Sequence, residues 1–143
     1  MTTSTLPSAT ATPSKGAHYG LWAVQGLLGL AFVMAGQMKL FTGIPELAKM
    51  LPWASSVPEA LVRFIGASEL LGGLGLILPA ATRIKPMLTP LAAAGLVLVM
   101  VLAAGFHATR GEFGALPINL VLGGLAGFVA WGRVKLAPIA PRS

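Results

Sequence analysis

The sequence contains no cysteine and few charged residues, and both absences narrow the classes of protein to which it can belong. Without cysteine the chain has no disulfide, no cysteine-ligated iron–sulfur cluster and no thiol redox chemistry. Charged residues make up 10% of the 143 positions, whereas a soluble domain has about 25%. Hydrophobic residues make up 55%, and a soluble surface with so few charges would aggregate. The composition therefore argues against a soluble domain.

The sequence also lacks the motifs of the common enzyme classes. No phosphate-binding glycine motif or serine elbow occurs, because the glycines lie inside apolar segments. The acidic residues and histidines do not have the spacing of a metal site. We therefore expect no catalytic residue and no metal site. An enzymatic activity stays undecided, and a protein without catalytic machinery of its own is favoured.

Four apolar segments fill most of the chain. Positions 19–38, 86–106 and 113–132 carry no charge, and positions 57–78 are interrupted only by Glu59, Arg63 and Glu69. A helix needs roughly 20 residues, at about 1.5 Å each, to cross the hydrocarbon core of a bilayer. The pattern predicts an all-α, polytopic membrane protein. Its transmembrane domain would cover 18–136, as a bundle of four helices at about 19–41, 57–78, 86–106 and 116–134.

The basic residues are unevenly divided between the two sides of this bundle. Four spans put both termini on one side, which then carries no acid and six basic residues, namely Lys15, Arg83, Lys85, Arg133, Lys135 and Arg142. The other side carries four basic and four acidic residues. The positive-inside rule predicts that both termini are cytoplasmic. The net charge of +6 then reflects membrane topology, and the expected partner is the lipid bilayer and not nucleic acid.

Local signals predict tails and helix ends. Residues 1–17 are rich in Ser, Thr, Ala and Pro and are expected to form a disordered cytoplasmic tail, with 137–143 as a second, short tail. Ser56 to Glu59 fits a capping box that begins the second helix, and Glu59 can pair with Arg63 one turn later. Pro86 is expected to begin the third helix. Residues 45–51 fit a short interfacial helix and a plain loop equally well.

Glycines mark the faces on which the helices are expected to pack. Lipid supplies no hydrophobic drive for helix association, so small residues that permit close approach are favoured at the contacts. The predicted packing positions are Gly29 and Gly36 in the first helix, Gly66 and Gly73 in the second, and Gly123 and Gly127 in the fourth.

Glu69 is the residue whose presence in a membrane span most needs an explanation. It lies near the middle of the second predicted helix, close to the bilayer centre, and shares a face with Gly66 and Gly73. It is therefore expected to point into the bundle. An ionisable group inside the membrane is functional by default.

The predicted topology brings other polar residues to the level of Glu69 or farther outward. Lys39 ends the first helix, His107 ends the third and Asn119 begins the fourth, each on a face with small residues. We predict a polar pocket in the outer half of the bundle, with Lys39, Glu69, His107, Asn119 and Gln37 as candidate ligand-binding residues. The inner half is expected to be dry, with Gln25 as its only polar side chain.

Each of these residues also has a structural explanation. Lys39 could anchor the helix at the headgroups, and His107 could face water at a helix end. Asn119 could cap its own helix or bond a neighbouring one, and Gln37 could hydrogen-bond across helices. Glu69 could be a protonated acid that is hydrogen-bonded within the bundle.

Several blocks of sequence resemble the DoxX-like family of small four-helix bacterial membrane proteins. They are GQMKL at 36–40, IGASELLGGLGLILP at 65–79, the basic turn at 81–85 and TPLAAAG at 89–95, within a similarity that covers about 20–135. The resemblance implies a multi-pass protein of the bacterial cytoplasmic (inner) membrane. It also implies that Lys39 and Glu69 occupy recurrent polar positions.

The resemblance further implies a link to quinone-linked redox or stress-response systems. The favoured hypothesis is a non-catalytic membrane subunit that binds a quinone-like or other small amphipathic molecule, or docks a redox partner. A transporter or proton-coupled carrier that uses Glu69 is an alternative, and with four helices it would need to dimerise. An assembly factor without a ligand is a third hypothesis. Apart from a quinone or lipid, no cofactor is expected, and the sequence does not decide the ligand, the partner or the oligomeric state.

Overall fold

The computed structural model describes residues 12–143, which form helices joined by short connections and contain no strand. Four helices are long and apolar enough to cross a membrane, namely α1 (Lys15–Phe41), α3 (Glu59–Thr82), α4 (Leu88–Thr109) and α5 (Leu116–Lys135). Shorter elements connect them, namely α2 (Ile44–Met50), η1 (Pro52–Ser55) and η2 (Phe113–Ala115). The predicted all-α bundle of four membrane helices is confirmed.

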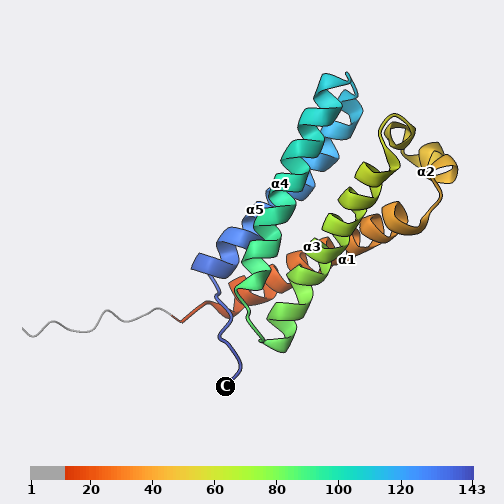
Figure 1. Ribbon diagram of the computed structural model, residues 1–143. Coiled ribbons are helices and arrows are strands. Elements are labelled where there is room, and N and C mark those ends of the chain that lie inside the picture. Colours follow the sequence, from red (N-terminus) through yellow and green to blue (C-terminus); the bar gives the residue numbers. More distant parts are fainter. Residues whose placement is uncertain (1–11) are drawn as a thin grey trace, which may run out of the picture.

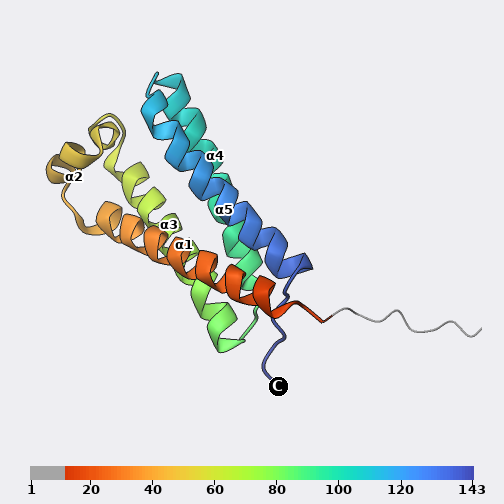
Figure 2. The ribbon, with the colours of Figure 1, turned by 180° about the vertical axis from the view of Figure 1, so that it is seen from behind.

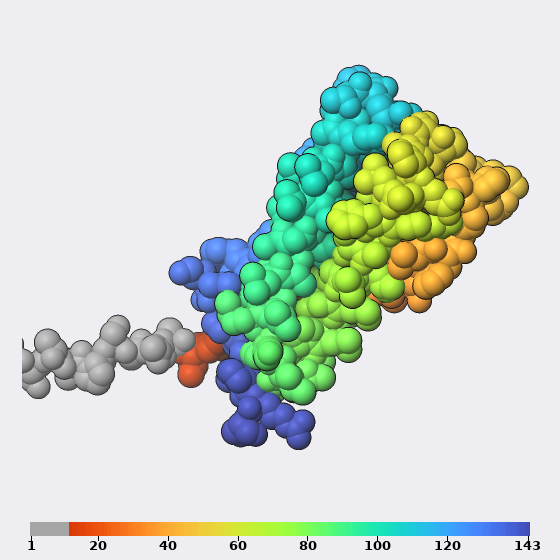
Figure 3. All heavy atoms as spheres, in the orientation of Figure 1, coloured from red at the N-terminus to blue at the C-terminus, as the bar shows by residue number. Residues whose placement is uncertain are grey.

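The four long helices form two pairs. Helix α1 packs along α3, and α4 packs along α5, while α3 and α4 join the pairs. Figures 1 and 2 show the two pairs close together near the C-terminus and diverging toward the opposite end. We call the end with the C-terminus and the start of α1 the terminal end, and the end with α2, η1 and η2 the loop end. The space-filling view in Figure 3 shows the face on which α3 meets α4.

Helix α1 begins earlier than the sequence pattern predicts. Ser14 is its N-cap, and the Ser14 hydroxyl oxygen accepts a hydrogen bond from the backbone N–H of Ala17. A serine cap of this kind satisfies one of the free N–H groups of the first turn. Residues 15–17 therefore belong to the helix and not to the predicted disordered tail, 1–17. Residues 1–11 of that tail lie outside the described residues.

The predicted capping box at Ser56–Glu59 is wrong. Helix α3 begins at Glu59 after Pro58, without a side-chain cap. Pro58 disfavours the helical conformation for Val57, so the helix cannot extend back to Ser56. Ser56 instead follows η1 as its C-cap. The prediction that Pro86 begins the third helix is also wrong, since helix α4 begins at Leu88. Pro86 belongs to the preceding turn, where its carbonyl oxygen accepts a hydrogen bond from the N–H of Thr89.

The apolar core holds the two pairs together in one half of the bundle. Its buried side chains come from all four long helices and are Leu28, Phe32, Leu76, Ala93, Leu96, Met100, Ala126 and Val129. A separate cluster of Leu47, Ala54 and Val62 packs α2 and η1 onto the loop end of α3. The segment 45–51 thus lies mostly within a helix, which buries Leu47 and exposes the Glu46–Lys49 ion pair.

Glycines let α1 and α3 touch backbone to backbone. A Cβ atom added at Gly36 would lie 2.5 Å from the Leu70 nitrogen and 2.6 Å from the Gly66 oxygen. One added at Gly73 would lie 2.7 Å from the Gly29 oxygen. Real Cβ atoms do not approach backbone this closely, so α1 and α3 can cross here only because these positions lack side chains.

The two glycines proposed as packing positions in α5 lie in looser contacts. A Cβ at Gly123 would meet the Met100 Cβ at 3.1 Å, and one at Gly127 would meet Val97 at an ordinary 3.8 Å. The packing therefore requires the absence of a side chain at the α1–α3 crossing much more strictly than at Gly127.

We expect Gly36→Ala to destabilise the protein by about 1–3 kcal/mol, because the added methyl group must push α1 away from α3. Gly26→Ala is the matched control, since a Cβ at Gly26 has no atom within 4 Å. The measurement is thermal unfolding in detergent micelles. Equal melting temperatures for the two variants would contradict the close crossing.

Candidate functional site

A large cavity lies between the two helix pairs in the loop half of the bundle. It has a volume of about 820 Å³ and is lined mainly by apolar side chains from α1, α3, α4 and α5, with α2 and η1 at the loop end. Lys39, Glu69, His107 and Asn119 all line it. Gln37 does not, because it is exposed on the outside of α1. Four of the five predicted pocket residues thus share one cavity.

Lys39 and Glu69 form a buried ion pair across the α1–α3 crossing. The Lys39 Nζ donates to the Glu69 Oε2 at 2.7 Å, and the two side chains are only 10% and 6% exposed. Lys39 therefore does not extend to the headgroups as an interfacial anchor would. A Cβ at Gly66 would lie 2.8 Å from the Lys39 Cβ, so the glycine makes room for the lysine stem.

Arg63 fixes the end of α1 that carries Lys39. Its Nη1 donates to the carbonyl oxygens of Lys39, at 2.6 Å, and Thr42, at 2.7 Å. Its Nε and Nη2 donate to the Glu59 Oε1, at 3.1 and 2.8 Å. The spacing of Glu59 and Arg63 predicts their pair. The hydrogen bonds from Arg63 to the end of α1 could not be predicted, because they depend on where that helix ends beside α3. Arg63 thus positions the backbone of Lys39.

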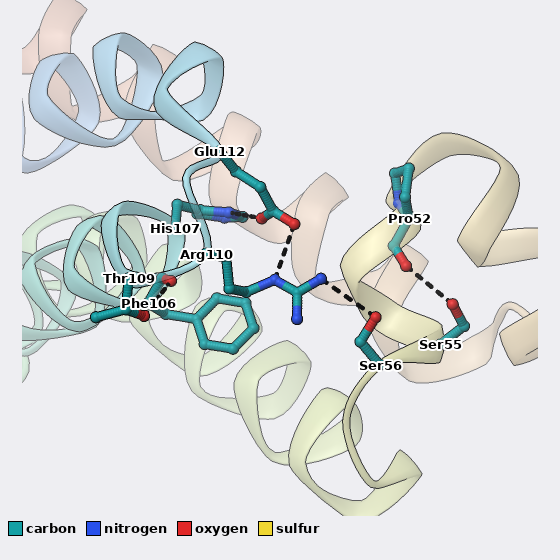
Figure 4. A network of polar contacts seen from close by, with 8 residues as sticks. All are labelled: Pro52, Ser55, Ser56, Phe106, His107, Thr109, Arg110 and Glu112. Carbon is teal, nitrogen blue, oxygen red and sulfur yellow. Dashed lines mark hydrogen bonds and ion pairs between the residues drawn. The ribbon is translucent and has the colours of Figure 1, made fainter.

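A second polar group lies at the loop end of the cavity (Figure 4). The His107 Nδ1 lies 2.6 Å from the Glu112 Oε2, and the Arg110 Nε donates to the Glu112 Oε1 at 2.8 Å. The Arg110 Nη2 donates to the Ser56 Oγ at 3.2 Å, which ties the α4–α5 connection to the segment after η1. Hydrogen bonds from His107 and then Arg110 lower the pKa of the Glu112 carboxyl. Glu112 also lines the cavity and is not among the predicted pocket residues.

Asn119 lines the cavity and carries a buried side-chain donor without a partner in the described part of the chain. The residue is 8% exposed, and its side-chain Nδ2 has no hydrogen-bond partner within residues 12–143. It does not cap α5, whose N-cap is Ala115. A buried donor without a partner costs about 1–3 kcal/mol, so Asn119 favours a ligand that offers an acceptor.

The prediction that Gln25 is the only polar side chain in the half next to the termini is wrong, because Arg133 is buried there as well. Arg133 is 3% exposed, and its Nε donates to the Gln25 Oε1 at 2.8 Å. Its Nη1 donates to the Ala137 oxygen at 3.1 Å and lies 3.4 Å from the His18 Nδ1. The chain after α5 bends back so that Ala137 is fully buried, and this covers an arginine that sequence reasoning assigns to the cytoplasmic surface.

A comparison with known protein families matches residues 23–129 to the DoxX-like family. The chain belongs to the DoxX-like family. The matched range contains Lys39, Glu69, His107 and Asn119, whereas Arg133 and His18 lie outside it. Searches of curated proteins and of solved structures gave no match. Family membership and four spanning helices together identify a multi-pass membrane protein of DoxX-like type.

In this DoxX-like protein, removing either partner of the ion pair leaves the other charge buried and unpaired. We expect Glu69→Leu and Lys39→Met each to destabilise the fold by about 3–5 kcal/mol. The double variant Lys39→Met/Glu69→Leu should recover most of this loss, because no charge then remains in the crossing. Thermal unfolding in micelles measures all three, and a double variant no more stable than the single ones would contradict the pairing.

Acidification tests the network at Glu112. Its folded-state pKa lies below the ordinary value of 4.5, so its carboxylate stabilises the fold fully above that pH. This contribution is lost as the pH falls through the folded-state pKa. Glu112→Gln should therefore lower the melting temperature above pH 4.5, and the difference from wild type should shrink in more acidic buffer. A difference independent of pH would count against the network.

Proposed function

We propose that this DoxX-like protein binds a small, neutral amphipathic molecule, such as a quinone, in the cavity between its helix pairs. The observation that carries the proposal is a cavity of about 820 Å³ with mostly apolar walls and a few polar side chains among them. Ligand pockets typically have about 300–1,000 Å³ and this composition. The proposed role is that of a non-catalytic membrane subunit that presents the ligand to a redox partner.

The pairing of the charges supports a neutral ligand. Lys39 is paired with Glu69, and Glu112 is paired with Arg110 and contacts His107. An ionic ligand would have to displace one of these partners, because each charged side chain that lines the cavity already has an opposite charge or a hydrogen-bond partner. A neutral molecule leaves both groups intact.

The free donors support a ligand with acceptor oxygens. Asn119 has an unpaired Nδ2, and the Lys39 ammonium has three donors but one hydrogen bond within the described residues. Ring carbonyl groups, as in a quinone, offer acceptors of this kind. A proton-coupled carrier that uses Glu69 would have to break its pair with Lys39 in each cycle.

We further propose that the terminal end faces the cytoplasm and that the membrane is the inner membrane of a bacterium. The charge distribution supports this orientation. All four acidic residues of the chain belong to the loop half, and the terminal end carries six basic residues. A measurement of terminus accessibility in intact cells tests this orientation separately from ligand binding.

Binding can be followed through Trp53, which lines the cavity. The double variant Trp22→Phe/Trp131→Phe leaves Trp53 as the only tryptophan, because the chain has three. We expect decylubiquinone to quench its fluorescence saturably in lipid nanodiscs. Asn119→Leu in this background should weaken binding about fivefold, which corresponds to the loss of one hydrogen bond.

Gln37→Leu is the matched control, since it makes a similar change on the outside of α1. It should bind decylubiquinone as the background does. Quenching that does not saturate, or equal affinity in the Asn119 and Gln37 variants, would overturn the proposed site.

A further inference from the structure

The walls of the cavity differ between its loop end and its flanks, and this difference indicates how a ligand reaches it. The inference deepens the proposed function and rests on it. The loop end would face the aqueous phase, and the flanks between the helices would face lipid.

Side-chain contacts bridge the two helix pairs at the loop end. Helix α2 and η1 are anchored on α3 through Leu47, Ala54 and Val62, and Trp53 of η1 lines the cavity. The Trp53 ring meets the rings of Phe106 and His107 edge to face, with centroids 5.9 and 6.3 Å apart.

A hydrogen bond from Arg110 to Ser56, which we call the Arg110 tie, spans the same end. The bond from Arg110 to Ser56 links the α4–α5 connection to the α1–α3 pair, and Arg110 also holds Glu112 (Figure 4). A molecule arriving from water would have to part both the aromatic contacts and this tie.

The seam between α3 and α4 is closed in the terminal half and opens in the loop half. A Cβ at Gly75 would lie 2.6 Å from the Ala92 Cβ, and one at Gly72 would lie 2.5 Å from a Leu96 methyl group. One turn closer to the loop end of α3, Ser68 lines the cavity. The tight contacts therefore end where the cavity begins.

Residues along this open part of the seam belong to both the cavity and the outer surface. Phe64 of α3 lines the cavity and is 69% exposed, and Leu102 of α4 lines it and is 64% exposed. Leu61 is likewise a lining residue and 42% exposed. Ile118 of α5 also lines the cavity and is 55% exposed, so α3 and α4 carry three of the four large apolar side chains of this kind on the long helices. The three on α3 and α4 are apolar and lie on membrane-spanning helices, so this boundary suits lipid and not water. Figure 3 shows the face on which α3 and α4 meet.

We propose that the ligand enters and leaves sideways from the bilayer, between the loop halves of α3 and α4. The ligand class is then a neutral molecule dissolved in the membrane. Its head group, which accepts hydrogen bonds, lies near Asn119 and Lys39. Its apolar chain extends past Ser68 and Phe64 into lipid. The aromatic cover and the Arg110 tie keep the head group away from water.

The test measures the rates of decylubiquinone binding by stopped-flow quenching of Trp53, in proteoliposomes of the single-tryptophan background. Ser68→Phe places a ring in the seam and should slow association and dissociation about tenfold, whereas affinity changes less. Slowing in both directions distinguishes a blocked passage from a filled cavity, which would speed dissociation. Leu71→Phe is the control, because Leu71 is 69% exposed on α3 and does not line the cavity.

Arg110→Gln tests the other route by removing the tie at the loop end. Rates equal to those of the background support access through the seam. Faster binding in Arg110→Gln, together with unchanged rates in Ser68→Phe, would overturn lateral access while leaving the proposed binding function intact. Absence of saturable quenching in the background protein would instead remove the proposed function itself, and lateral access with it.

Discussion

The ion pair between Lys39 and Glu69 is the interaction on which the loop half of the bundle depends. Either charge alone inside a membrane-spanning bundle would cost several kcal/mol in lost hydration, so each needs the other. The 2.7 Å contact lies at a crossing where Gly36 and Gly66 bring the helix backbones together. Glycine packing and charge pairing therefore support each other in holding α1 against α3.

The cavity follows from how this pair meets the second one. In the terminal half the apolar core, with Phe32 and Leu96, joins all four long helices. At the loop end the pairs meet again through the Trp53 rings and the Arg110–Ser56 bond. The helix pairs diverge toward the loop end (Figures 1 and 2). The cavity of about 820 Å³ lies between these two contacts. The cavity is thus the region between two attachment points, with Glu69 in its wall.

Much of this arrangement can be predicted from the sequence because it rests on hydropathy and helical periodicity. The spacing of uncharged segments indicates four spans, and the shared face of Gly66, Glu69 and Gly73 indicates that the acid points inward. Up-and-down topology then brings Lys39, His107 and Asn119 to the same half. The adjacent Gln37 could not be excluded by the same reasoning, because about 100° of rotation separates neighbouring residues and the exact facing of α1 decides the matter.

The partners of long side chains could not be predicted. A lysine at a helix end can reach the headgroups or turn inward, and only the distance to the neighbouring helix decides between them. Arg63 shows the same limit, because its bonds to the Lys39 and Thr42 oxygens depend on where α1 ends beside α3. Sequence spacing identifies contacts within one helix, whereas these contacts join two.

Arg133 shows how differently the two halves accommodate a buried charge. In the loop half a lysine is neutralised by a carboxylate, but the terminal half contains no acid, and Arg133 is held by the neutral oxygens of Gln25 and Ala137. Its position in the last turn of α5 adds the favourable field of the helix C-terminus. The ring of Trp22, 5.2 Å from the guanidinium, covers another side. Hydrogen bonds and aromatic packing hold the guanidinium at this end, whereas the large cavity lies in the other half, where a carboxylate neutralises the buried lysine.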